Sequence, residues 1–235
     1  MTILALETAT DTCSAALWQD RSVVAEAHLH QPRVHAQRLT PLVDTLLAHG
    51  GVEADALDAV AVSEGPGSYT GLRIGVSTAK GWALATEAAL VGVPTLEAWA
   101  AQVTPWARAG DTVCALIDAR RDEVYAAAYR VDANGTLRPQ AEATAASVDA
   151  LPDWLGSVDG TLWGVGDGAP KSHDVLVAHA SGPVRLVSTD VVPPSAAWVA
   201  RRANARLDAG ETEDVATFEP FYLKDFHGTP PPSPL

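Results

Sequence analysis

Gly65-Pro-Gly-Ser-Tyr-Thr-Gly-Leu-Arg-Ile-Gly75 is the stretch of sequence that decides the fold of this chain. An apolar run from Leu57 to Val62 precedes it and predicts a strand, and the residues from Thr70 to Thr86 predict a helix. A strand that leads through a glycine-rich turn into a helix is typical of a layered α/β protein. We therefore predict an α/β fold.

The glycine-rich loop has two interpretations. Glycine permits backbone conformations that other residues avoid, and the amides at the start of the following helix could hold an anion. The residues of this candidate anion site are Gly65, Pro66, Gly67, Ser68, Tyr69, Thr70 and Arg73. The spacing matches neither a P-loop nor the dinucleotide-binding fingerprint, and by itself it favours the alternative, a sharp structural turn.

Further strands and helices are predicted on the N-terminal side of the chain, within a lobe that covers residues 1–105. Apolar runs bounded by turn residues predict strands over Ile3 to Leu6, Cys13 to Trp18, Val23 to Leu29 and Val91 to Val93. Apolar spacing predicts a helix from Thr40 to His49, with Pro41 as its first residue, and another from Leu96 to Gln102. Pro105 and Gly110 mark the boundary.

A second lobe, residues 106–228, repeats this plan. Strands are predicted over Val113 to Ile117, Glu123 to Val131 and Thr161 to Val165, with a hairpin turn at Asn134-Gly135. Ser195 is the expected N-cap of a helix that ends near Leu207. The proline-rich tail, residues 229–235, is expected to be disordered.

Small residues recur every fourth position along the helix after the glycine-rich loop. They are Gly71, Gly75, Ala79 and Ala83, and such a bare stripe lets another element approach closely. A partner molecule and the sheet of the same chain are both candidates for that element.

Few side chains have the spacing of a catalytic or metal site. His35 is followed four residues later by Leu39, so the His-x-x-x-His pair of a helical metal site is absent, and a surface or capping role is expected for His35. Acidic residues stand near strand ends, where they could hold Mg²⁺ or activate water, although solvated turn carboxylates are the simpler interpretation. They are Glu7, Asp11, Asp118, Glu123 and Asp167.

Composition limits the classes of partner. The chain has 235 residues, 16 Lys plus Arg and 29 Asp plus Glu, so its formal charge is −13 and strong independent binding to nucleic acid is not expected. Two cysteines, Cys13 and Cys114, form no disulfide framework. The absence of a leader pattern or a long apolar stretch predicts a cytoplasmic protein with no membrane partner.

Five segments, distributed in order along nearly the whole chain, resemble the TsaB (YeaZ) family. They are Ile3 to Leu17, His35-Ala-Gln-Arg-Leu39, the glycine-rich stretch itself, Ile117-Asp-Ala-Arg-Arg-Asp-Glu-Val-Tyr125 and Glu219-Pro-Phe-Tyr-Leu223. The resemblance implies a two-lobed fold of the actin, Hsp70 and sugar-kinase (ASKHA) type, each lobe being a mixed sheet with flanking helices.

The resemblance also implies a function. Members of this family are non-catalytic scaffold or activator subunits in the formation of threonylcarbamoyladenosine in tRNA. Their expected partners are the catalytic subunit TsaD and the ATPase TsaE, and tRNA is met only through that complex. When TsaD is absent, a homodimer that uses the partner-binding face is compatible with this function.

In this family the early helix and the helix after the glycine-rich turn form the partner face. The residues that this assigns to the interface here are Leu39, Leu42, Val43, Leu46, Gly71, Leu72, Gly75, Val76, Ala79, Lys80 and Ala83.

Two departures from related enzymes predict a chain without catalytic activity, metal or cofactor. Leu39 stands where the catalytic paralogue has its second metal-binding histidine. ATP-using relatives have Asp-x-Gly-Ser/Thr in their first phosphate loop, whereas this chain has Glu7-Thr8-Ala9-Thr10, and the Cβ of Ala9 crowds the approach of a phosphate. The alternative function is an independent ATP-dependent kinase or hydrolase of the same fold.

Overall fold

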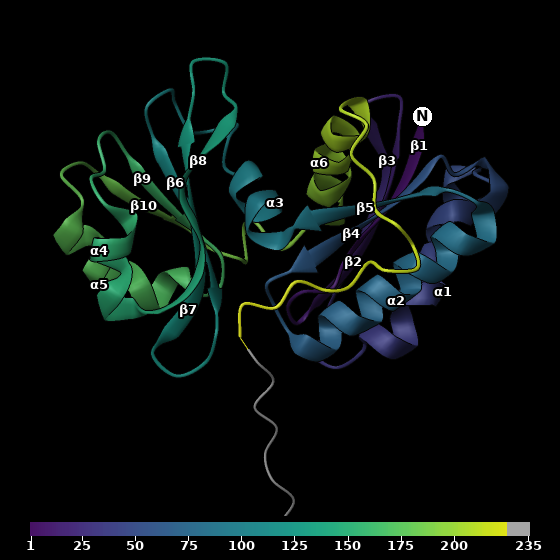
Figure 1. Cartoon of the computed structure of the whole chain (residues 1–235), viewed down its shortest axis with the longest axis horizontal. Helices are drawn as coiled ribbons and strands as arrows, with labels where there is room; N and C mark the ends of the chain where they lie inside the picture. Colours follow the sequence, from purple (N-terminus) through teal and green to yellow (C-terminus); the bar gives the residue numbers. More distant parts are fainter. Residues whose placement is uncertain (225–235) are drawn as a thin grey trace, which may run out of the picture.

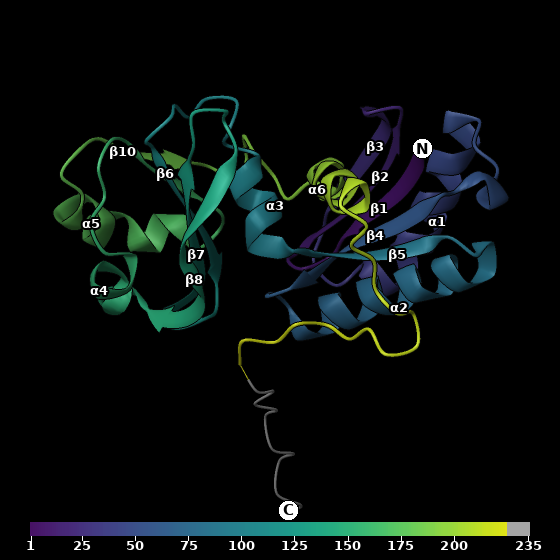
Figure 2. The same cartoon turned by 45° about the horizontal axis from the view of Figure 1, so that its top comes forward.

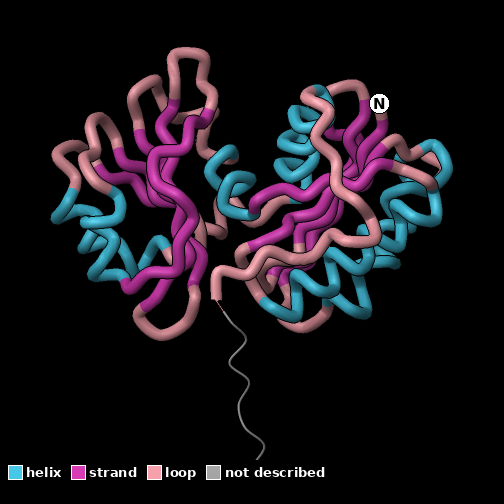
Figure 3. The backbone as a smooth tube through the Cα atoms, in the orientation of Figure 1, coloured by secondary structure: helices cyan, strands magenta, loops and turns pink. Residues whose placement is uncertain are grey.

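The computed structural model describes residues 1–224, which form two lobes built around five-stranded mixed sheets (Figures 1 and 3). In the N-terminal lobe the strand order is β3-β2-β1-β4-β5. The three antiparallel strands come first and β4 and β5 run parallel to β1. The strands of this sheet are β1 (Thr2–Glu7), β2 (Thr12–Gln19), β3 (Ser22–His30), β4 (Ala59–Gly65) and β5 (Ala89–Pro94).

The C-terminal lobe repeats this plan with strand order β10-β9-β6-β7-β8. Here β6, β7 and β8 are antiparallel, and β9 and β10 run parallel to β6. Its strands are β6 (Thr112–Asp118), β7 (Glu123–Val131), β8 (Leu137–Ser147), β9 (Leu162–Val165) and β10 (Val184–Val187). The prediction of two lobes with mixed sheets is confirmed.

Helices cover both faces of each sheet, which is why β1 and most of β6 are buried along their length. In the N-terminal lobe, α1 (His35–Gly50) and α2 (Tyr69–Thr86) lie side by side on one face (Figure 1). In the C-terminal lobe, α4 (Leu151–Leu155) and α5 (Ala169–His179) cover the outer face. Single turns of 3₁₀ helix occur at Ala54–Ala56 and Val148–Ala150.

The remaining two helices lie between the lobes, and neither packs solely on the sheet of the lobe to which the expected boundary at residue 105 assigns it. The apolar side of α3 (Thr95–Ala101) packs on the sheet of the C-terminal lobe, with Trp99 in that core. In return, α6 (Ala196–Asp208) packs on β1 and β2 of the N-terminal lobe, where the Trp18 indole donates to Asn204 Oδ1 at 3.2 Å. Turn residues mark where the chain bends, whereas apolar faces decide which sheet a helix joins.

The expected start of α1 is also wrong. The helix begins at His35, and Pro41 lies inside it rather than at its first position. A proline removes one hydrogen bond to the carbonyl four residues earlier, here that of Gln37. Both residues are exposed, so water can satisfy that carbonyl and the helix continues.

Several elements escaped the sequence analysis, namely β8, α4, α5 and β10. The predicted tail, residues 229–235, lies outside the described residues. Within residues 1–224, no helix is long and apolar enough to cross a membrane.

Candidate functional site

The glycine-rich loop packs directly on the loop between β1 and β2. A Cβ at Gly67 would overlap Ala9, and one at Gly71 or Gly75 would overlap Thr8. Two hydrogen bonds stabilise the contact. The Ser68 N–H donates to the Ala9 carbonyl at 2.7 Å, and the Thr8 hydroxyl donates to the Gly71 carbonyl at 2.9 Å. The glycines are therefore needed where two backbone segments meet.

Amides at the start of α2 are engaged within the chain. Ser68 caps the helix, its Oγ accepting from the Gly71 N–H at 3.3 Å. The Ser68 amide is already bound to Ala9, as described above, and Thr70 is exposed. Two amides that could donate to an anion at this loop, those of Ser68 and Gly71, therefore already have acceptors within the chain. This favours a sharp structural turn over an anion site.

The C-terminal segment completes the loop on its other side. Gly65 has a φ of +131°, and a Cβ there would overlap the Phe221 carbonyl, while the Phe221 N–H donates to the Glu64 carbonyl at 2.7 Å. Pro66, between the two loop glycines, is buried. The loop is thus enclosed by two segments from opposite ends of the chain.

Aromatic side chains extend this contact to the surface. The rings of Tyr69 and Tyr222 stack with their centroids 4.7 Å apart, and the Arg73 guanidinium carbon lies 4.3 Å from the centroid of the Tyr69 ring. From the sequence, the segment Glu219 to Leu223 carries only the family resemblance. Its role was missed because no local pattern relates Tyr222 to Tyr69, which is more than 150 positions away.

The small-residue stripe, for which a partner and the sheet of the same chain were both candidates, lies against its own lobe. Gly71, Gly75, Ala79 and Ala83 are buried, and they face Thr8 and the core beneath α2. Other expected interface residues are also buried, namely Leu72, Val76, Leu39, Val43 and Leu46, and all of these except Leu72 belong to that core. Leu42 and Lys80 are partly exposed. The sheet of the same chain, and not a partner, therefore accounts for the stripe.

The solvent-exposed side of α2 carries a different set of residues. Arg73, Ser77, Gly81 and Ala85 follow one another at every fourth position and are all exposed. Leu84, beside them, is 74% exposed, and Trp82 is partly exposed. Around Gly81, a Cβ would meet no atom within 4 Å. This exposed side is the part of α2 that another molecule can reach, and we call it the outer face of α2.

The Glu7 carboxylate binds the backbone of its own loop, the one between β1 and β2. Glu7 is fully buried, and its Oε1 accepts a 2.7 Å hydrogen bond from the Ala9 N–H. Its Oε2 is buried without a hydrogen bond from the residues that the structure describes. Burial raises the pKa of Glu7 from its usual 4.5 to about 7, against the lowering effect of the Ala9 bond. The Ala9 amide of this loop is thus bound within the chain by Glu7.

Three acidic residues from two lobes lie close enough to influence one another. Asp167 accepts a 2.8 Å hydrogen bond from the Asp118 N–H, and burial together with the charges of Asp118 and Asp11 raises its pKa. Lys171 neutralises Asp118 at 2.6 Å, and this contact lowers the pKa of Asp118 against the raising effect of burial. Glu7 is not part of this cluster, and within residues 1–224 no group of side chains has the arrangement of a metal site.

His35 has a packing role that differs from the surface or capping role expected. It is buried, and its Nε2 lies 3.2 Å from the Thr12 carbonyl, so it ties the start of α1 to β2. Leu39 is 1% exposed and belongs to the core under α1.

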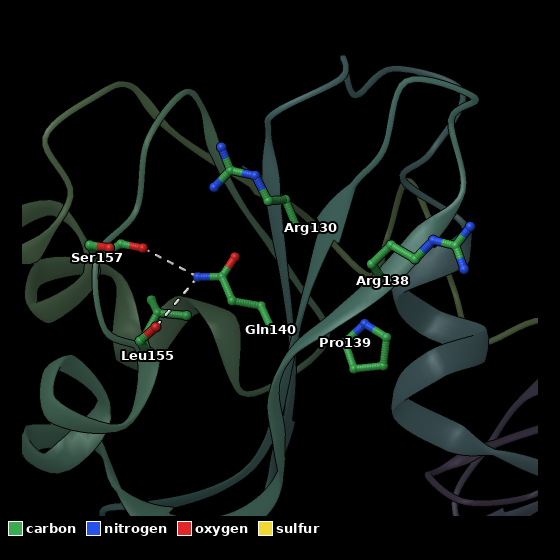
Figure 4. A pocket seen from close by; sticks show the side chains of 6 residues that line it. All are labelled: Arg130, Arg138, Pro139, Gln140, Leu155 and Ser157. Atoms are coloured by element: carbon green, nitrogen blue, oxygen red, sulfur yellow. Dashed lines mark hydrogen bonds between the residues drawn. The ribbon is translucent and has the colours of Figure 1, made fainter.

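One shallow pocket lies in the C-terminal lobe, away from the glycine-rich loop (Figure 4). Gln140 reaches across it and donates to the carbonyls of Leu155 and Ser157. The guanidinium groups of Arg130 and Arg138 point to opposite sides, so they do not converge on one ligand (Figure 4).

Comparisons with known proteins agree with this geometry. The family described as "TsaD: tRNA N6-adenosine threonylcarbamoyltransferase" matches residues 23–160. The tRNA threonylcarbamoyladenosine biosynthesis protein TsaB of Escherichia coli (strain K12) is 37% identical over 226 residues, which cover 96% of this chain and 95% of that protein.

Solved structures extend the agreement to three dimensions. YeaZ from Pseudomonas aeruginosa superposes with a TM-score of 0.79 at 30% identity, over 94% of this chain and 99% of that one. The ROK hexokinase from Thermus thermophilus, at 11% identity and a TM-score of 0.50 over 89% of this chain and all of that one, shares the fold alone. The expected two-lobed fold of the actin and sugar-kinase type is therefore confirmed. The chain belongs to the family of the matching sequence model and, within it, to the TsaB (YeaZ) family.

Proposed function

We propose that the chain is a non-catalytic scaffold or activator subunit in the formation of threonylcarbamoyladenosine in tRNA. The observation that carries this proposal is the 37% identity to the TsaB biosynthesis protein across 96% of the chain. In this proposal the chain binds a TsaD-like threonylcarbamoyltransferase, works with a TsaE-like ATPase, and contacts tRNA only through them.

Two features support the absence of catalysis by the chain itself. Leu39 lies in the core at the position of a second metal-binding histidine, so His35 has no companion ligand on α1. Glu7 holds the Ala9 amide that a phosphate would need, and a phosphate near an ionised Glu7 would be repelled.

The outer face of α2 is the proposed contact for the partner. Its small residues, Ser77 and Gly81, permit another helix to approach closely, and Leu84 offers apolar area, since its side chain is 74% exposed. The buried stripe cannot serve, because it is already packed on Thr8. In the absence of TsaD, the same face can join two copies of this chain.

Gly81→Leu tests the proposed face. We expect the variant to fold, because the new side chain meets open space, and to lose retention of TsaD on an affinity column because it holds the two surfaces apart. The matched control is Ala178→Leu, at an exposed position of α5 in the other lobe, which should bind normally. Normal binding by Gly81→Leu would contradict the assignment of the face.

Reconstitution tests the function itself. Purified TsaD-like and TsaE-like proteins, supplied with threonylcarbamoyl adenylate, ATP and tRNA, should transfer the threonylcarbamoyl group to tRNA with release of AMP only when this chain is added, and Gly81→Leu should reduce the yield. The chain alone should turn over no ATP. Steady ATP hydrolysis or phosphoryl transfer by the isolated chain, abolished by a substitution at Glu7 or Asp167, would instead favour the independent enzyme.

A further inference from the structure

The last described residues form a strap that is held firmly on the N-terminal lobe. We call residues 213–224 the C-terminal strap; it runs along α2 and ends between the lobes (Figures 1 and 2). The Glu213 N–H donates to the Leu90 carbonyl at 2.8 Å, and Phe218 is buried in the core under α2. The Lys80 ammonium donates to the carbonyls of Ala216, at 3.3 Å, and Phe218, at 2.9 Å.

The far end of the strap touches the other lobe through a charged side chain. Lys224 Nζ lies 2.6 Å from Glu123 Oε2, at the first residue of β7, and 5.8 Å from the centroid of the Tyr125 ring. The Glu123 carbonyl in turn accepts a 2.6 Å hydrogen bond from Lys171, which is paired with Asp118. The strap therefore joins α2 of one lobe to the β6–β7 hairpin of the other.

This contact is separate from the places where the chain itself crosses between the lobes. The crossings are the junction of β5 with α3 and residues 188–195 before α6. Glu97 on α3 pairs with Arg202 and Arg206 on α6, so the two crossing helices are tied to each other. The strap is a further link, made of non-covalent contacts that can open without breaking either crossing.

The charges that face each other across the lobes oppose closure. Asp11 comes from the N-terminal lobe, and Asp118 and Asp167 come from the C-terminal lobe, close enough for the charges of Asp11 and Asp118 to raise the pKa of Asp167. Lys224 brings a positive charge from the N-terminal lobe to Glu123 on the opposite one. Its side chain is 26% exposed and that of Glu123 is 42% exposed, so water and salt can compete for the pair.

We propose that the C-terminal strap is a clasp that limits the opening of the two lobes, and that the ion pair between Lys224 and Glu123 is its releasable contact. The several anchors on α2 keep the strap in place when this pair opens. A partner or a salt condition that takes Lys224 away from Glu123 then loosens the lobes without unfolding either one.

The distance between two spin labels, one on each lobe, tests this in the full chain. Asp44→Cys on α1 and Asp174→Cys on α5 introduce exposed labelling sites. The native thiols do not compete, because burial raises the pKa of Cys13 to about 11 and of Cys114 to about 12, and both are buried. Pulsed electron paramagnetic resonance then reports the populations of shorter and longer separations.

Removing either charge should release the clasp. In Lys224→Gln and in Glu123→Gln we expect the ratio of longer to shorter separations to rise about two- to fivefold, as the loss of one partly exposed ion pair allows. The double variant Lys224→Glu with Glu123→Lys should return the ratio towards that of the parent. Arg138→Gln, which removes the surface pair with Asp132 inside one lobe, is the control and should leave it unchanged.

The outcomes separate cleanly when each variant is first shown by its melting temperature to be folded. Distance distributions of Lys224→Gln and Glu123→Gln that match Arg138→Gln would overturn the clasp. A shift in the single variants that the charge-swapped pair fails to reverse would overturn the ion pair as its releasable contact. A shift that the swap reverses supports both statements.

Discussion

Glu7 carries the pH dependence that belongs to a single residue. Its pKa is raised from 4.5 to about 7 by burial, so the folded chain holds this proton more tightly than the unfolded chain does. The linkage is such that the free energy of unfolding is largest below about pH 4.5 and falls as the pH rises through 7. The ionised form must stay in the core, where the cost of burial outweighs the stabilising effect of the Ala9 amide and the Ser63 hydroxyl.

Glu7→Gln should remove this dependence, because the amide keeps an acceptor for the Ala9 N–H and does not ionise. Relative to the parent, the variant should gain about 3 kcal/mol in free energy of unfolding between pH 4.5 and pH 8. Denaturant unfolding of both proteins across that range measures the difference, and other groups that titrate alike in both cancel. A difference that does not change with pH would show that Glu7 titrates normally.

At the scale of the element, α2 has one buried side and one exposed side, and each side carries small residues. Gly75 lies against Thr8, whereas Gly81 faces open space. The same substitution at the two positions therefore meets opposite environments on one helix.

Gly75→Ala should destabilise the chain and Gly81→Ala should stabilise it. Overpacking against Thr8 costs about 1–3 kcal/mol, which exceeds the gain in helix propensity of up to about 1 kcal/mol. At Gly81 the new methyl group meets open space, so only the gain in helix propensity remains. The melting temperature should fall by several degrees in the first variant and rise by about 2–4 °C in the second. Equal shifts in the two variants would mean that α2 is packed differently.

At the scale of the whole molecule, the surface charge decides what the isolated chain can bind. With 16 basic and 29 acidic residues, it lacks the excess of Lys and Arg that neutralises a phosphate backbone. In a gel-shift experiment at physiological salt, we expect no complex of the chain with tRNA at micromolar concentration and a complex only after the partner proteins are added. A sub-micromolar complex formed by the chain alone would refute this.

Local sequence patterns were sufficient to predict the strands and helices whose apolar residues are buried on one or both faces of the element. The strands near Ile3, Cys13 and Val113 and the helix that contains Gly71 were all located, because continuous apolar runs and a 3.6-residue apolar period both arise from burial itself. Two edge strands of the C-terminal lobe were missed, although the edge strands β3 and β5 of the N-terminal lobe were located. β8 is largely exposed and contains Pro139, and β10 has four residues with none buried.

The glycine-rich stretch shows where the information in the sequence ends. The spacing of its small residues predicted that another element would approach α2 closely. Its position among the other motifs along the chain identified the family. Only the tertiary structure decided that this backbone is Thr8 and Ala9 of the same chain, because a stripe of small residues has no side chains to specify what lies against it. The packing of α6 on the N-terminal lobe and the pairing of Lys224 with Glu123 were likewise decided by the packing of the whole chain, since they join residues more than 100 positions apart.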